Sequence, residues 1–136
     1  RYPMTSTLST HILLVDDDPC ARGALVAALD PLQVTAVTSG FQCVQCLSRD
    51  DSINVLLLDD DLAALDGLEI ARRLRETAAD LPIIVIGTDD RPEKLLEVLR
   101  AGATAFLAKP VLPAELTALV EACCEDCRAL AQRMAA

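Results

Sequence analysis

Residues 55–61 read VLLLDDD, four aliphatic residues followed directly by three aspartates. Residues 12–18 repeat this pattern as ILLVDDD, and residues 105–110, AFLAKP, place a lysine where the acids stand. A short apolar run between polar residues is typical of a buried strand in a parallel sheet. Because parallel strands end at one edge, where open α/β sheets bind their ligands, we expect the aspartates and Lys109 to meet there.

Short strands and helices alternate along the rest of the chain. Strands are expected at 12–15, 34–37, 55–58, 83–86 and 104–108, and helices at 19–29, 40–47, 67–77, 92–101 and 113–134. Predicted N-caps are Asp18 or Asp17, Ser39, Asp66 and Asp90, and Gly102 is expected just beyond a helix end. This order predicts an α/β fold, a doubly wound sheet of five parallel strands flanked by five helices.

The chain of 136 residues suits one domain. We expect residues 1–9 to be an N-terminal tail or a remnant of cloning, and residues 10–128 to form the domain. Residues 129–136 would be the end of the last helix or the start of a linker to an output domain. A formal net charge of -9 argues against direct nucleic-acid binding or an anionic membrane surface. No apolar stretch approaches the roughly 20 residues of a membrane span, so we expect a cytoplasmic protein.

Six cysteines raise the question of a metal or redox site. Cys43 and Cys46 form a C-x-x-C, and Cys123, Cys124 and Cys127 form a second cluster. Both clusters fall within helical patterns, without the turn residues of a zinc knuckle. We therefore favour small apolar helix residues, lying on opposite faces of the sheet, over zinc or redox chemistry.

The charged edge predicts a specific chemistry. Asp16, Asp17 and Asp59 would converge there, and carboxylates without a histidine favour Mg²⁺ or Mn²⁺. Lys109 could pair with the central carboxylate or with an anion brought to it. A carboxylate beside such a cation and a lysine is suited to attack phosphorus. Asp18, Asp60 and Asp66 are expected to cap helices or to be solvated.

Four stretches together, in this order and at these spacings, carry a family resemblance: ILLVDDDP, VLLLDDDLAALDGLEIARRLR, LPIIVIGTDD and AGATAFLAKP. The chain resembles the receiver domain of two-component response regulators, of the chemotaxis-regulator type, from Thr10 to about Arg128. The resemblance implies a flavodoxin-like sheet with strand order 2-1-3-4-5. It also implies that a histidine kinase or phosphotransfer protein donates a phosphoryl group, with Mg²⁺ as the cofactor.

The resemblance assigns roles to individual residues. Asp16 and Asp17 match the acidic metal-binding pair. Asp59 matches the phosphoacceptor, because the family's Asp-Gly pair follows that residue by seven positions, as Asp66-Gly67 does here. Asp61 would offer its backbone carbonyl to the metal. Lys109 matches the family lysine, whose bond to the next proline is typically cis.

Several positions depart from the family pattern. Gly87 stands where most receivers have Thr or Ser, and Thr88 beside it should point elsewhere, since neighbouring strand residues face opposite ways. Phe106 holds the aromatic switch position, and Ala63 replaces a usual proline. Losing one hydrogen bond to a charged group costs about 1.5–3 kcal/mol, comparable to a typical allosteric coupling. Acetyl phosphate or BeF₃⁻ is therefore expected to act at Asp59 but to shift Phe106 and the helix after Pro92 only weakly.

Three functions remain open at this point. The first is a phosphoacceptor that regulates a partner or attached output domain, with at most self-phosphorylation and autodephosphorylation as enzymatic activity. The second is a pseudo-receiver, an interaction module with a weakened or absent switch. The third is a phosphohydrolase of the haloacid-dehalogenase type, although its acidic pattern fits less well. A homodimer through the helix after Pro92, the strand at 104–108 and the last helix is also expected; charges there include Glu93, Lys94, Glu97, Arg100 and Glu115.

Overall fold

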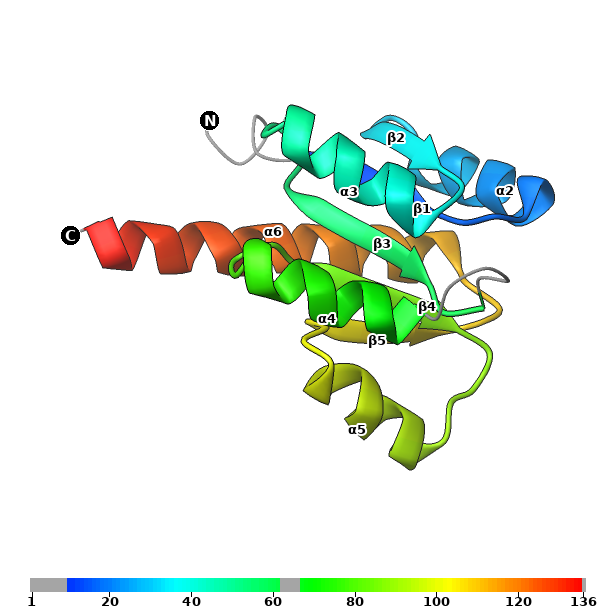
Figure 1. Cartoon of the computed structure of the whole chain (residues 1–136). Helices are drawn as coiled ribbons and strands as arrows, with labels where there is room; N and C mark the ends of the chain where they lie inside the picture. Colours follow the sequence, from blue (N-terminus) through cyan, green and yellow to red (C-terminus); the bar gives the residue numbers. More distant parts are fainter. Residues whose placement is uncertain (1–9, 62–66, 136) are drawn as a thin grey trace.

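The computed structural model describes the backbone of residues 10–61 and 67–135, with side chains as far as residue 124. Its strands are β1 (His11–Val15), β2 (Gln33–Val37), β3 (Val55–Asp59), β4 (Ile83–Gly87) and β5 (Ala105–Ala108). Its helices are α2 (Pro19–Leu29), α3 (Gly40–Arg49), α4 (Gly67–Thr77), α5 (Pro92–Arg100) and α6 (Pro113–Ala135). The strands form one parallel sheet in the order β2-β1-β3-β4-β5, as predicted (Figure 1).

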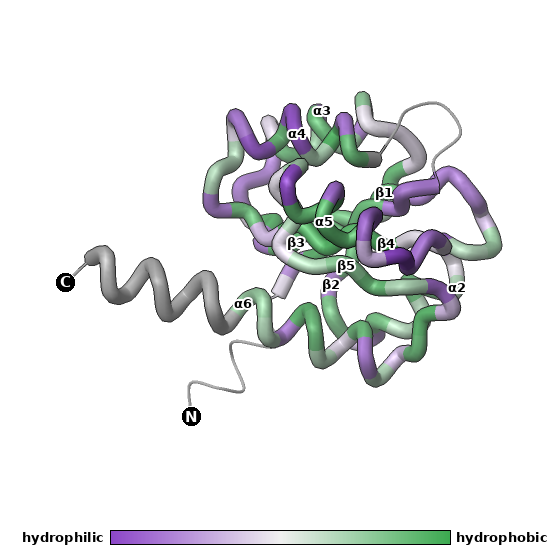
Figure 2. The backbone as a smooth tube through the Cα atoms, turned by 90° about the horizontal axis from the view of Figure 1, so that it is seen from below, coloured by the Kyte–Doolittle hydropathy of each residue, from purple (hydrophilic) through white to green (hydrophobic). Residues whose placement is uncertain are grey.

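The sheet separates two apolar cores. Alternate strand residues such as Leu13 and Leu56 face one core with α3, α4 and α5, whereas Ile12 and Leu57 face the other with α2 and α6. Strands β1, β3 and β4 are fully buried on both faces, which accounts for their continuous aliphatic runs. The apolar colouring of these strands between more polar helices is visible in Figure 2.

The sheet register brings the strand ends together at one edge. Val15 of β1 lies opposite Leu58 of β3, and Asp59 lies opposite Ile86 of β4. Gly87, the last residue of β4, lies opposite Ala108 of β5. The residues that follow these positions, Asp16 and Lys109, are therefore placed on either side of Asp59.

Helix caps agree with the sequence except at α5. The Asp18 side chain accepts a hydrogen bond from the Cys20 amide at the start of α2, and Ser39 accepts one from Gln42 at the start of α3. Gly102 follows α5 with a φ of 107°, as expected for a residue after a helix end. The prediction that Asp90 caps α5 is wrong.

At α5 the N-cap is Arg91, which has no side-chain cap bond. The Asp89 carboxylate instead accepts hydrogen bonds from the Arg91 amide and guanidinium and thereby forms the turn before the helix. The predicted cap Asp66 and the proline replacement Ala63 lie outside the described residues.

Helix α6 is the longest element, with 23 residues, and its final turns extend past the sheet (Figure 1). Within the described part of the chain, no helix combines the length and apolar character required to cross a bilayer. The Lys109–Pro110 peptide bond is cis, as the family resemblance implies, and so is Asp30–Pro31.

Candidate functional site

Two buried carboxylates lie at the carboxyl edge of the sheet. Asp16 follows β1 and is 0% exposed, and Asp59 ends β3 and is 4% exposed. The Asp16 backbone amide bonds the Val37 carbonyl at 3.1 Å, so β2 fixes its position. One Asp16 oxygen accepts a 3.0 Å bond from the Asp18 amide. Both carboxylates are thus held by backbone geometry at the place predicted for the site.

The Lys109 side chain crosses the edge of the sheet and contacts residues at the end of β3. Its Nζ lies 3.2 and 3.3 Å from the two carboxylate oxygens of Asp59 and 3.1 Å from Asp61 Oδ2. The Lys109 amide bonds the Gly87 carbonyl at 2.9 Å, which anchors its backbone to β4. Burial lowers the pKa of Lys109, but hydrogen bonds to Asp61 and Asp59 outweigh this and raise it above the ordinary value. The lysine is therefore a permanent cation beside Asp59.

Asp16 is electrostatically strained in the absence of a cation. Burial, together with the charge of Asp59 and a hydrogen bond to it, raises the pKa of Asp16 from 3.8 to about 6, despite the opposing Asp18 amide and Lys109 charge. Two carboxylates this close disfavour simultaneous ionisation unless positive charge compensates them. Lys109 bonds Asp59 directly, and it reaches Asp16 only as a weaker, more distant charge.

The same carboxylates suit a hard divalent cation. The second oxygen of Asp16, Oδ2, is buried and accepts no hydrogen bond from the described residues. An all-oxygen donor set of this kind is the preference of Mg²⁺, which also keeps several waters. Within residues 10–61 and 67–124, no three acidic, His or Cys side chains gather closely enough to hold a metal alone. Asp17 is half-buried, and the expected ligand set of Asp16, Asp17, Asp59 and the Asp61 carbonyl stays a prediction.

Asp60 is an ion-pair partner, whereas the sequence suggested a solvated side chain. Its Oδ2 lies 2.7 Å from Lys94 Nζ of α5, and the two side chains are 8% and 15% exposed. The three consecutive acids of the loop are therefore shared between two lysines: Lys109 contacts Asp59 and Asp61, and Lys94 contacts Asp60. The sequence placed Lys94 among the charges of the expected dimer contact. No sequence signal identified its pairing with Asp60.

The three switch positions have clear places in the fold. Gly87 is buried at the end of β4, and Thr88 is exposed; that Thr88 does not replace the missing hydroxyl stays a prediction. A Cβ atom at Gly87 would lie 3.3 Å from both Asp60 Cβ and Phe106 Cε1. Phe106 itself packs against the core that α3, α4 and α5 cover. The space beside Gly87 is thus filled by Asp60 and by the Phe106 ring.

A cavity of about 300 Å³ opens beside the carboxylates. Asp16, Asp59 and Lys109 form its polar end. Its apolar lining comes from α2, the end of β4 and the segment leading into α6: Ala21, Ala24, Leu25, Ala28, Ile86, Pro110, Val111 and Pro113. The Asp59 carboxylate therefore borders a recess with apolar walls.

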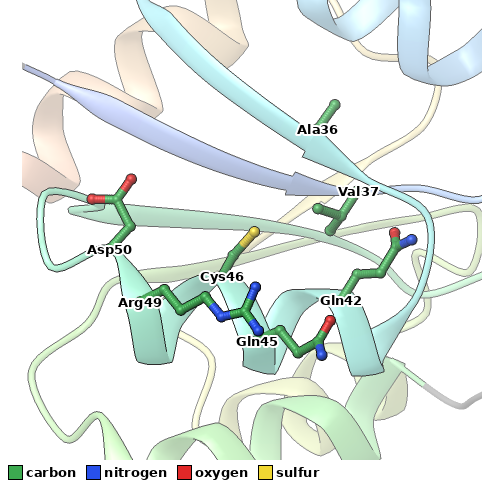
Figure 3. Close-up of a pocket in the computed structure, with 7 residues that line it drawn as sticks. All are labelled: Ala36, Val37, Gln42, Gln45, Cys46, Arg49 and Asp50. Carbon is green, nitrogen blue, oxygen red and sulfur yellow. The ribbon is translucent and has the colours of Figure 1, made fainter.

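A second cavity, of about 380 Å³, lies between β2 and α3 (Figure 3). It is lined by Ala36, Val37, Gln42, Gln45, Cys46, Arg49 and Asp50, and it contains neither Asp16, Asp59 nor Lys109. Burial, with the nearby Cys46 thiol, raises the pKa of the neighbouring Cys43 to about 12, so the Cys43 thiol is unreactive.

The cysteines lie where the sequence placed them. Cys43 belongs to one core, and Cys123 and Cys124 belong to the other, on opposite faces of the sheet. All three are buried, and the side chain of Cys127 lies outside the described part. Their packing is that of small apolar residues.

A buried acidic pair, a lysine bridging the strand ends and a parallel sheet of order 2-1-3-4-5 define the receiver class of signalling domains. Residues 12–121 match the family model of the response regulator receiver domain, and the chain belongs to this family.

Among curated relatives, the chain is 37% identical over 114 residues to the response regulator MprA of Mycobacterium leprae, covering 82% of this chain and 50% of MprA. It is 28% identical to the two-component response regulator ORR3 of Oryza sativa subsp. indica, covering 80% of this chain and 86% of ORR3. The chain thus spans about half the length of MprA. The fold is shared with a CheY-like receiver domain protein of Methanospirillum hungatei, with a TM-score of 0.80, 21% identity and coverage of 88% and 96%.

Proposed function

We propose that this domain accepts a phosphoryl group on Asp59 from a histidine kinase or phosphotransfer protein, with Mg²⁺ as cofactor. The contact of Lys109 Nζ with both oxygens of Asp59 carries the proposal, since it marks Asp59 as the carboxylate at the centre of the site. The neighbouring acids differ from it, because Asp60 is paired with Lys94 and Asp61 is exposed. Of Asp59, Asp60 and Asp61, Asp59 is the residue that is both buried and in the lining of the cavity.

In the proposed transfer, an Asp59 oxygen attacks the phosphorus of a phosphoimidazole. The new P–O bond forms as the P–N bond breaks, and the imidazole leaves with that electron pair and takes up a proton from solvent. Lys109 lies 3.2 Å from the attacking carboxylate and can offset charge on the phosphoryl oxygens. Asp16, Asp17 and the Asp61 carbonyl would hold Mg²⁺, which supplies further positive charge at the same place.

The donor protein would dock over the apolar recess that adjoins Asp59. Helix α2 contributes Ala21, Ala24 and Leu25 to this recess, and Pro110 and Val111 lie on the other side. An apolar surface beside the acceptor lets a donor histidine approach while water is excluded. We place this exchange in the cytoplasm.

The domain would regulate an attached output domain or a partner protein, as expected of a response regulator. Two copies are proposed to associate through α5, β5 and α6. Helix α5 supports this proposal, because Leu95, Leu96 and Leu99 are exposed on it.

The test is phosphorylation by acetyl phosphate and MgCl₂, followed by Phos-tag gel mobility and intact mass. The wild-type chain should gain one phosphoryl group, Asp59→Asn should gain none, and EDTA should abolish the reaction. Asp51→Asn, an exposed carboxylate outside the site, is the matched control and should react as the wild type does. Equal labelling of Asp59→Asn and wild type would refute the assignment.

A pseudo-receiver is the second candidate, and one observation favours it: Asp60 and Phe106 fill the space beside Gly87 where the family's hydroxyl would stand. In that case the wild-type chain would take no phosphoryl group from acetyl phosphate. Continuous release of p-nitrophenol from p-nitrophenyl phosphate would instead indicate a phosphohydrolase.

A further inference from the structure

We propose that the Asp60–Lys94 ion pair, rather than a hydroxyl at the end of β4, connects the phosphorylation state of Asp59 to helix α5. The proposal rests on the function proposed above and identifies the route by which that site is regulated. It also changes an expectation from the sequence, because the missing hydroxyl alone predicted a weak response of both α5 and Phe106.

The ion pair joins two elements that are otherwise far apart in the chain. Asp60 follows the acceptor directly, and its amide bonds the Ile86 carbonyl at 2.8 Å, so its backbone is fixed to β4. Its Oδ2 lies 2.7 Å from Lys94 Nζ, in the first turns of α5. With exposures of 8% and 15%, both side chains are shielded from solvent ions. The contact is short, buried and directly beside the proposed acceptor.

Phosphorylation would change the charge that Lys94 experiences. An acyl phosphate on Asp59 carries more negative charge than the carboxylate it replaces. Lys109 already contacts Asp59 and Asp61, so Lys94 is the other described ammonium close to this loop. The pKa of Asp89 is lowered chiefly by hydrogen bonds to Arg91, and the charge of Lys94 lowers it to a smaller extent. Added negative charge at Asp59 therefore increases the electrostatic attraction of Lys94 to residues 59–61 relative to its attraction to Asp89.

The usual route is closed at the same place. Gly87 offers no hydroxyl, and the Asp60 side chain and Phe106 ring already occupy the adjacent space. A movement of residues 59–61 would therefore displace the Asp60 side chain before it displaces the Phe106 ring. Helix α5 should respond through Lys94 while the Phe106 ring stays in place.

The experiment uses the full chain with BeF₃⁻ and Mg²⁺ as the phosphoryl probe. Backbone amide shifts of α5 and ring shifts of Phe106 are followed by NMR, and bound BeF₃⁻ is followed by ¹⁹F resonances. In the wild-type chain, α5 amides should shift clearly and Phe106 little. Lys94→Gln should reduce the α5 shifts about fivefold or more, the lower end of typical couplings, without changing bound BeF₃⁻.

Two further variants separate coupling from simple destabilisation. Lys94→Arg keeps the charge and should preserve the α5 response. Arg100→Gln removes an exposed cation from the last turn of the same helix and should behave as wild type. If Lys94→Gln unfolds, Asp60→Asn with Lys94→Gln replaces it, because that double variant leaves no unpaired charge.

The outcomes are distinct. Wild-type-sized α5 shifts in a folded Lys94→Gln variant, or α5 shifts lost equally in Arg100→Gln, would overturn the ion-pair route alone. Bound BeF₃⁻ with no α5 shift in the wild-type chain would do the same. Absence of bound BeF₃⁻ in the wild-type chain would overturn both this inference and the proposed phosphoacceptor function.

Discussion

At the scale of single residues, Gly87 determines how its neighbours pack. A side chain there would meet Asp60 Cβ and Phe106 Cε1 at 3.3 Å, closer than ordinary packing. The backbone itself does not demand glycine, because among the described glycines a positive φ occurs at Gly102 and not at Gly87. The glycine is explained by the space that Asp60 and Phe106 take.

Gly87→Thr is therefore expected to move the Phe106 ring outward. Overpacking lowers the free energy of unfolding by about 1–3 kcal/mol. Replacing glycine also reduces the conformational entropy of the unfolded chain, which raises the free energy of unfolding by about 0.4–1 kcal/mol. The net loss of unfolding free energy should be about 1 kcal/mol, measured by urea denaturation. The restored hydroxyl should also increase the Phe106 ring shift on BeF₃⁻ addition.

Thr88→Ala is the control for this variant, since it removes an exposed hydroxyl one residue away. It should change neither stability nor the Phe106 response. A Gly87→Thr variant whose Phe106 signals match those of wild type in both states would contradict the prediction.

The sequence predicted the positions of some site residues but not the partners of others. The convergence of Asp16, Asp59 and Lys109 follows from strand ends in a parallel sheet, and the structure confirms it. The ion pair of Asp60 could not be predicted, because its side chain leaves the strand end in a direction set by tertiary packing. Its partner Lys94 lies 34 positions further along the chain, on a helix whose rotation the sequence does not specify.

At the scale of elements, sequence patterns predicted the order and type of every described strand and helix, because aliphatic runs and helical spacing differ in period. The start of α5 was the exception. Asp89 and Asp90 are both capable of turning the chain, and the bonds from Arg91 select Asp89. When two adjacent residues could both form the turn before a helix, the available hydrogen-bond partner decides between them. Residue spacing in the sequence does not show which partner is within reach.

Helix α5 also carries a prediction of its own. If two copies associate through it, Leu96→Glu should place charge in the contact and lower the dimer association constant about tenfold, for a cost of about 1.4 kcal/mol. Sedimentation velocity over a concentration series measures this. Val44→Glu is the matched control, because Val44 is equally exposed but lies on α3. An equal loss in both variants would argue against α5 as the contact.

At the scale of the whole molecule, stability should depend on pH through Asp16. Its pKa is raised from 3.8 to about 6, so the folded chain binds a proton more tightly than the unfolded chain. The unfolding free energy of the metal-free protein should therefore fall as pH rises from about 4 to about 6, by about 1–3 kcal/mol. The Asp16→Asn variant, which has no such proton, isolates this contribution as a difference from wild type.

Mg²⁺ should reverse this loss. At a free concentration ten times its dissociation constant, binding adds about 1.4 kcal/mol to wild-type stability at pH 7. Thermal denaturation should show this gain in wild type and little of it in Asp16→Asn. An equal gain in both would mean that Asp16 is not a ligand.

The crowding around Gly87 has a consequence for how this chain can diverge. A Thr side chain at 87 would contact the Asp60 side chain. Replacing Asp60 would leave the largely buried Lys94 ammonium without this ion-pair partner, and replacing Lys94 would do the same to the Asp60 carboxylate. The penalties at Asp60 and Lys94 disappear when both residues are replaced together, whereas the contact at 87 involves the Cβ atom of residue 60 and the Phe106 ring and remains. Asp60 and Lys94 therefore form an epistatic pair, inherited or exchanged together rather than one at a time.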